Sequence, residues 1–146
     1  MLKIVQAATA LLALMSFSPA MASTPWVEYF PHPGGKPFSQ AVRVGNFVYV
    51  SGTTGRAADG TYPDDFSVQA VNAMEAQAAE LTLAGATWDD VFRCRVALTD
   101  MDDWDAFNAV YRKYFKPDRL PARMAIAVVS LGGSDVEIQC EAFLTK

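Results

Sequence analysis

Arg123 stands at the head of an apolar run, in the stretch RLPARMAIAVV at residues 119–129. Moving a guanidinium group out of water is costly unless a negative charge or a polar ligand pairs with it. Its planar fork offers two parallel donors, which match a carboxylate better than the point charge of a lysine does. We therefore expect Arg123 to hold either the carboxylate of a small ligand or an acidic side chain across a subunit interface, with Glu137 and Glu141 as candidate partners.

Other residues that could carry chemistry are few. His32 is the single histidine, so a histidine-rich metal site is excluded. The acidic residues of TDMDDWD lack the glycine of a calcium loop and suit the first turn of a helix, where exposed N–H groups favour negative charge. We expect no metal ion and no cofactor.

The two cysteines, Cys94 and Cys140, fall on the same face of their strands by alternation. A disulfide between them can form if those strands are neighbours in the sheet. We favour two buried thiols, because free cysteine packs well as a small apolar residue. Neither cysteine is expected to be a nucleophile, because no basic partner is placed for it.

Residues 1–22 have the features of an export signal. Lys3 precedes an apolar stretch, and Ala20-Met21-Ala22 is a signal-peptidase pattern, so we expect cleavage after Ala22 and a periplasmic or secreted protein. The apolar stretch is shorter than the roughly 20 residues that span a bilayer. Loss of Lys3 takes the net charge from −4 to −5, a balance that disfavours nucleic-acid binding.

Residues 23–146 are expected to form a single domain with two helices and several strands. A hairpin turns at Gly45-Asn46, and strands are predicted within residues 90–100, 122–131 and 136–144, the last two joined by the turn GGSD. One helix is expected over residues 65–84 and the other over about 101–115. Their predicted apolar stripes are Val68, Val71, Met74, Ala78 and Leu81 in the first, and Trp104, Phe107, Val110, Tyr111 and Tyr114 in the second. Phe92, Cys94, Val96 and Leu98 are expected on one face of their strand.

This order of elements predicts an α+β fold of the α/β-sandwich type, with one mixed sheet and two helices on one face. The other face would then carry Arg93, Arg95, Glu137, Gln139 and Glu141. An uncovered sheet face of this mixed character is typical of a subunit interface.

Four separated motifs resemble the RidA (YjgF) family, also called the reactive-intermediate deaminase or endoribonuclease L-PSP family. They are FSQAVRVGNFVYVSGTTG, VFRCRVALTDMDDWDAFNAVYRKYF, LPARMAIAVVSL and VEIQCEAF, and together they cover the chain from about Pro37 to its end. The resemblance implies a chorismate-mutase-like fold and a homotrimer, with three ligand clefts between neighbouring subunits. It also implies that Arg123 of the P-A-R segment binds the carboxylate of a small 2-imino or 2-oxo acid.

The resemblance assigns further positions to the site. Gln139 stands where many relatives have a glutamate, Phe38 where they have a tyrosine, and Ala125 where they have a cysteine. Gly52 and Asn108 match the family pattern, and Asn108 is expected to hold a loop or an interface. The implied catalytic residues are Arg123 and Gln139, and the implied substrate-binding residues are Arg123, Phe38, Gly52, Ala125 and Asn108.

Two functions follow from the resemblance. The first is hydrolysis of enamines and imines such as 2-aminoacrylate by an exported 2-iminobutanoate/2-iminopropanoate deaminase. The alternative is a non-catalytic protein that binds small carboxylates, because the amide of Gln139 cannot accept a proton as a general base would. RNA cleavage, which the older family name suggests, is disfavoured by the acidic charge balance.

Overall fold

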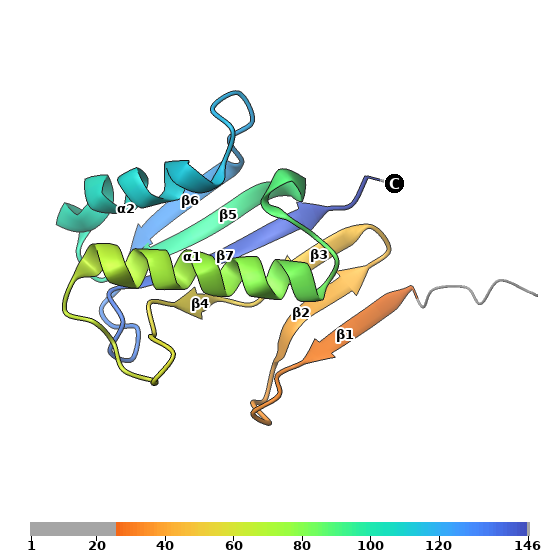
Figure 1. Ribbon diagram of the computed structural model, residues 1–146, viewed down its shortest axis with the longest axis horizontal. Coiled ribbons are helices and arrows are strands. Elements are labelled where there is room, and N and C mark those ends of the chain that lie inside the picture. Colours follow the sequence, from red (N-terminus) through yellow and green to blue (C-terminus); the bar gives the residue numbers. More distant parts are fainter. Residues whose placement is uncertain (1–25, 146) are drawn as a thin grey trace, which may run out of the picture.

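The computed structural model describes residues 26–145, so the predicted export signal and its cleavage site lie outside the described residues. It contains one mixed sheet in the order β1-β2-β3-β7-β5-β6, with β4 paired to β7. Two helices lie across one face of this sheet, as predicted (Figure 1). The elements are β1 Val27–Pro31, β2 Ser39–Val44, β3 Phe47–Val50, β4 Thr53–Thr54, α1 Phe66–Leu83, β5 Val91–Leu98, α2 Trp104–Tyr111, β6 Ala122–Ala127 and β7 Val136–Phe143. Neither helix in this part of the chain is long and apolar enough to cross a membrane.

The first three strands form an antiparallel meander. The predicted turn between β2 and β3 is confirmed, and Gly45 adopts a φ of 57°, which favours glycine. Strand β1 was not predicted, because the prolines around it indicated an extended, turn-rich segment. It pairs with β2 at the edge of the sheet, where Pro31 lies at its end and the missing N–H group is tolerated.

Helix α1 has the predicted ends but a different buried face. Asp65 accepts hydrogen bonds from the backbone N–H groups of Ser67 and Val68. The predicted apolar stripe is wrong in part, since Val68 and Val71 are exposed. The sheet-facing side instead carries Ala70, Ala73, Met74 and Leu81 together with the polar residues Gln69, Gln77 and Glu80.

The buried amides of α1 are tolerated because they bond to backbone groups of the sheet and its loops. Gln77 donates to the carbonyl of Ser51 at 2.7 Å and accepts from the N–H of Cys140 at 3.0 Å. Gln69 donates to the carbonyl of Pro63 and accepts from the N–H of Asp135. Buried polar groups with such partners cost little, so these residues share the buried face with Met74 and Leu81 of the expected stripe.

The centre of the sheet is the antiparallel pair β5 and β7. Cys94 lies directly opposite Cys140, and the two form a disulfide, so the prediction of two free thiols is wrong. Phe92 was expected on the buried face with Cys94, but the register shifts between Val91 and Arg93, and Phe92 is exposed. The strands joined by the GGSD turn are not neighbours, because β5 lies between β6 and β7. β6 runs parallel to β5 and ends at Ala127.

Glu80 lies in the interface between α1 and the sheet. One carboxylate oxygen, Oε1, accepts from Gln40 at 3.5 Å, and the other, Oε2, is buried with no partner in the described part of the chain. Burial raises the pKa of Glu80 from an ordinary 4.5 to about 7, and the Gln40 hydrogen bond opposes this shift. The folded protein therefore holds this proton more tightly than the unfolded chain does.

Stability is consequently expected to fall as the pH rises from about 4.5 to about 7. Glu80→Gln remains neutral, so its free energy of unfolding should exceed that of the wild type by about 1–2 kcal/mol at pH 8 and by much less at pH 4.5. Urea unfolding at both pH values measures the difference. Asp118→Asn, which removes one exposed carboxylate, is the control, and equal gains in both variants would contradict the prediction.

Candidate functional site

Arg123 points toward the helices from β6, a strand at the edge of the sheet. It lies opposite Cys94 of β5, which lies opposite Cys140 of β7, so the three side chains share the helix-covered face. There its Nη2 donates to Oδ1 of Asn108 at 2.7 Å. Asn108, which was predicted to hold a loop or an interface, lies on α2 and contacts the side chain of Arg123.

Aromatic rings of α2 surround the same guanidinium group. Cζ of Arg123 lies 4.5 Å from the ring centroid of Trp104 and 4.5 Å from that of Tyr111. The faces of such rings attract cations, which offsets part of the cost of taking the guanidinium out of water. The rings and Asn108 together fix the direction of the fork.

No acidic side chain pairs with Arg123 among residues 26–145. Glu141, one candidate partner, instead forms an ion pair with Arg95 at 2.9 Å. Glu137, the other candidate partner, lies opposite Ala97 of β5 and Thr54 of β4 in the strand pairing. Its side chain is therefore on the opposite face of the sheet from Arg123. Within the described part of the chain, the guanidinium makes one hydrogen bond, to Asn108, so further donors of Arg123 remain available to a ligand.

A cavity of about 250 Å³ adjoins Arg123. Since one water occupies about 30 Å³ in the liquid, this space has room for a small metabolite. α2 forms one side of the cavity, and the start of β6 with the loop before it forms the other. The lining residues are Trp104, Asn108, Tyr111, Arg112, Leu120, Pro121 and Arg123.

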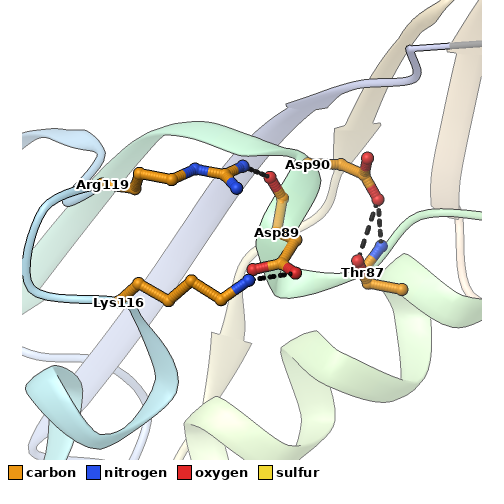
Figure 2. Close-up of polar contacts among 5 residues, drawn as sticks. All are labelled: Thr87, Asp89, Asp90, Lys116 and Arg119. Atoms are coloured by element: carbon orange, nitrogen blue, oxygen red, sulfur yellow. Dashed lines mark hydrogen bonds and ion pairs between the residues drawn. The ribbon is translucent and has the colours of Figure 1, made fainter.

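The loop before β6 is held by polar contacts with the turn that precedes β5 (Figure 2). Lys116 forms an ion pair with Asp89 at 2.7 Å, and Arg119 donates to the carbonyl of Asp89 at 2.8 Å. Asp90 in turn accepts from the backbone and side chain of Thr87. These contacts are exposed and individually weak, but together they position Leu120, which lines the cavity.

The charge state of the cavity follows from burial and from its neighbours. Burial lowers the pKa of Arg123, with a smaller contribution from the charge of Arg112, while Tyr111 acts in the opposite direction. An arginine nevertheless stays protonated in proteins. Burial raises the pKa of Tyr111 to about 12, so its hydroxyl keeps its proton at neutral pH. The hydroxyl group of Tyr111 is buried and has no hydrogen-bond partner among the described residues.

Gln139 does not lie near Arg123 within one chain. Gln139 lies opposite Arg95 of β5, which in turn lies opposite Met124 of β6. These three side chains point to the sheet face that the helices leave uncovered. Oε1 of Gln139 accepts from Nη1 of Arg95 at 3.1 Å. A hollow of about 130 Å³ on this face is lined by Gln139 together with Arg95, Val96, Ala97, Met124, Ile126 and Glu137.

The remaining predicted positions are spread over the fold. Gly52 faces Glu137, and a Cβ there would lie 1.9 Å from the carboxylate oxygen, so only glycine leaves room for that side chain. Phe38 precedes β2, is half-exposed and packs edge-on against His32 at 5.6 Å. Ala125 follows Arg123 by two residues, on the same face, and packs against the core.

Five cavity residues were not among the predicted site residues, namely Trp104, Tyr111, Arg112, Leu120 and Pro121. The first two were assigned only to the apolar stripe of the second helix. Their spacing around Asn108 contained a usable signal, because residues three and four apart lie on the same side of a helix. The single apolar strand around Arg123 gave no indication of which helix would face it.

The chain was compared with known proteins. The profile described as Endoribonuclease L-PSP matches residues 31–144. A RutC family protein of Pyrococcus abyssi is 38% identical over 127 residues, which cover 83% of this chain and 94% of the relative. The 2-iminobutanoate/2-iminopropanoate deaminase of Mus musculus is 36% identical over 106 residues, covering 70% and 78%.

A solved structure supports the same relationship. RidA from an Antarctic Psychrobacter species superposes with a TM-score of 0.70 at 34% identity, and the match covers 75% of this chain and 89% of that one. The residues that the family profile matches contain all the described strands and helices from β2 onward, as well as the P-A-R segment at Arg123. The chain therefore belongs to the endoribonuclease L-PSP family, which is also called the RidA or YjgF family.

Proposed function

We propose that this protein hydrolyses small 2-imino acids and their enamine tautomers to 2-oxo acids and ammonia. The observation that carries the proposal is Arg123, which is partly buried beside a cavity, is held by Asn108, and has no carboxylate partner among residues 26–145. The family relationship supports the reaction type, since the mouse relative is named a 2-iminobutanoate/2-iminopropanoate deaminase.

The proposed mechanism depends mainly on positioning. Arg123 grips the carboxylate of the substrate through two parallel hydrogen bonds, and Asn108 keeps the guanidinium in place. Water adds to the imine carbon, and the resulting carbinolamine expels ammonia to leave the 2-oxo acid. Binding the carboxylate places the imine carbon at a defined point in the cavity.

We propose that the protein forms a homotrimer with clefts between neighbouring subunits. In such an assembly, Gln139 and Phe38 of one subunit can contribute to the cleft that contains Arg123 of another. Within one chain both residues lie away from Arg123, and Gln139 is on the opposite face of the sheet. The open face offers a surface for such an assembly, since it carries Tyr49, Met124 and Ile126 as exposed apolar side chains. We further propose that the mature protein begins after Ala22 and acts outside the cytoplasm.

A second candidate is a non-catalytic carboxylate-binding protein. It is favoured by Gln139, whose amide binds Arg95 and cannot accept a proton from water. Phe38 likewise lacks a hydroxyl group that could orient water. In this case the cavity beside Arg123 would bind 2-oxo acids without turnover.

The two candidates are separated by adding purified mature protein to 2-aminoacrylate generated in situ and following ammonia release. Hydrolysis by the wild type above the buffer rate supports the deaminase. We expect Gln139→Glu to raise the rate by at least about tenfold, because a positioned general base contributes a factor of about 10² to 10⁴.

Gln139→Ala is the control for this prediction, since it removes the amide without supplying a base. A silent wild type with an active Gln139→Glu variant indicates a carboxylate-binding protein whose catalytic base has been lost. A wild type that neither hydrolyses the imine nor binds pyruvate contradicts both candidates.

A further inference from the structure

Two arginines, not one, line the cavity beside α2. Arg112 follows the last residue of α2, and its side chain borders the same 250 Å³ space as Arg123. It also lines an adjoining hollow formed with Phe115, Pro117 and Leu120. Arg112 therefore borders both spaces, and the residue is itself exposed.

Nothing in the described chain neutralises this second charge. No aspartate or glutamate lines the cavity, and the ion pairs within residues 26–145 use Arg43, Arg95 and Lys116. Arg112 makes no side-chain hydrogen bond to any residue of this part of the chain. Its charge also opposes that of Arg123 and lowers the pKa of Arg123, so the two groups act on each other.

Stabilisation of the helix end does not account for the position of Arg112. Basic residues near the C-terminus of a helix are favoured by its dipole, and both Arg112 and Lys113 meet that condition. Lys113 can interact with the helix dipole although it is exposed and does not line the cavity. Two like charges around a small cavity are unfavourable unless an anion binds between them.

We propose that the cavity selects four- or five-carbon 2-imino or 2-oxo dicarboxylates. Arg123 binds the carboxylate next to the reacting carbon, and Arg112 binds the carboxylate at the far end. The volume of about 250 Å³ accommodates a compact acid of this length. This inference rests on the proposed function and adds to it a substrate class and a specificity-determining residue.

The test compares two five-carbon ligands, 2-oxoglutarate and 2-oxopentanoate, which differ in the distal carboxylate. Titration calorimetry with the full mature protein should show that the wild type binds 2-oxoglutarate at least about tenfold more tightly, the factor that a charge-assisted hydrogen bond supplies. Because Arg112 is exposed, this preference should shrink as the salt concentration rises.

Arg112→Gln should reduce the preference for 2-oxoglutarate over 2-oxopentanoate to about twofold or less. Lys113→Gln is the matched control, since it removes the same charge from the next residue and should keep the preference. The readout is a ratio of two affinities, so a uniform loss of folded protein does not imitate the expected result.

The failure of this inference differs from the failure of the proposed function. Equal binding of both ligands by the wild type, or an unchanged preference in Arg112→Gln, overturns the dicarboxylate assignment while carboxylate binding at Arg123 stands. If neither 2-oxo acid binds, the proposed function and the inference both fall.

Discussion

Arg123→Ala should abolish ligand binding and imine hydrolysis together. The substitution removes the group that would grip the carboxylate and leaves the cavity without its inner positive charge. Loss of a charge-assisted bidentate contact weakens binding of the substrate and transition state by several kcal/mol. We therefore expect kcat/KM to fall by at least about a hundredfold. Ammonia release and calorimetric titration with pyruvate measure the two effects.

Two further variants show whether the geometry of the fork matters. Arg123→Lys keeps the charge but loses the parallel donors and the bond to Asn108, so it should recover only a small part of the activity. Arg56→Ala removes a charge that lies over Tyr62, outside the cavity, and should behave as the wild type. Full activity in Arg123→Ala would contradict the assignment of the site.

Joint replacement of Cys94 and Cys140 by alanine should lower the free energy of unfolding by about 2–4 kcal/mol. The disulfide closes a loop across a sequence separation of 46 residues and joins the two central strands. Without it the unfolded chain gains conformational freedom, and small voids form in the core, where both cysteines are fully buried. Urea unfolding under non-reducing conditions measures the loss.

Reduction provides the matched comparison for this prediction. A reducing agent should lower the Tm of the wild type by about 10 °C and leave that of the double variant unchanged. Denatured, unreduced wild type should contain no reactive thiol from Cys94 or Cys140. Two reactive thiols, with a Tm insensitive to reductant, would restore the interpretation of two buried cysteines.

Local sequence signals determined the ends of α1 and the turn between β2 and β3 correctly. They were wrong for β6, which ends at Ala127 and not at residue 131, and for α2, which spans only Trp104–Tyr111 of the expected 101–115. The cap at Asp65 and the positive φ of Gly85 delimit α1, and Gly45 forms the turn between β2 and β3. These features depend on a few neighbouring residues, because capping bonds and glycine conformations are satisfied within one turn of the chain. Alternation in β7 likewise identified its buried face, since side chains of a strand alternate strictly.

Other features were decided by contacts between distant segments. The buried face of α1 is partly polar because the carbonyl of Ser51 and the N–H of Cys140 lie where Gln77 can bond to them. Phe92 turned outward because of a bulge in the pairing of β5 with β7. Neither partner could be identified from the sequence around the residue itself.

The candidate site shows the same division. From the sequence, Arg123 could be recognised as a charge that needs a partner, because an apolar strand makes an isolated guanidinium costly. Only the tertiary structure placed α2 over the edge of the sheet, which brings Asn108 to Arg123 and adds Arg112 to the cavity. Side-chain type is a local property of the chain, whereas the neighbours of a side chain depend on how the helices and strands pack.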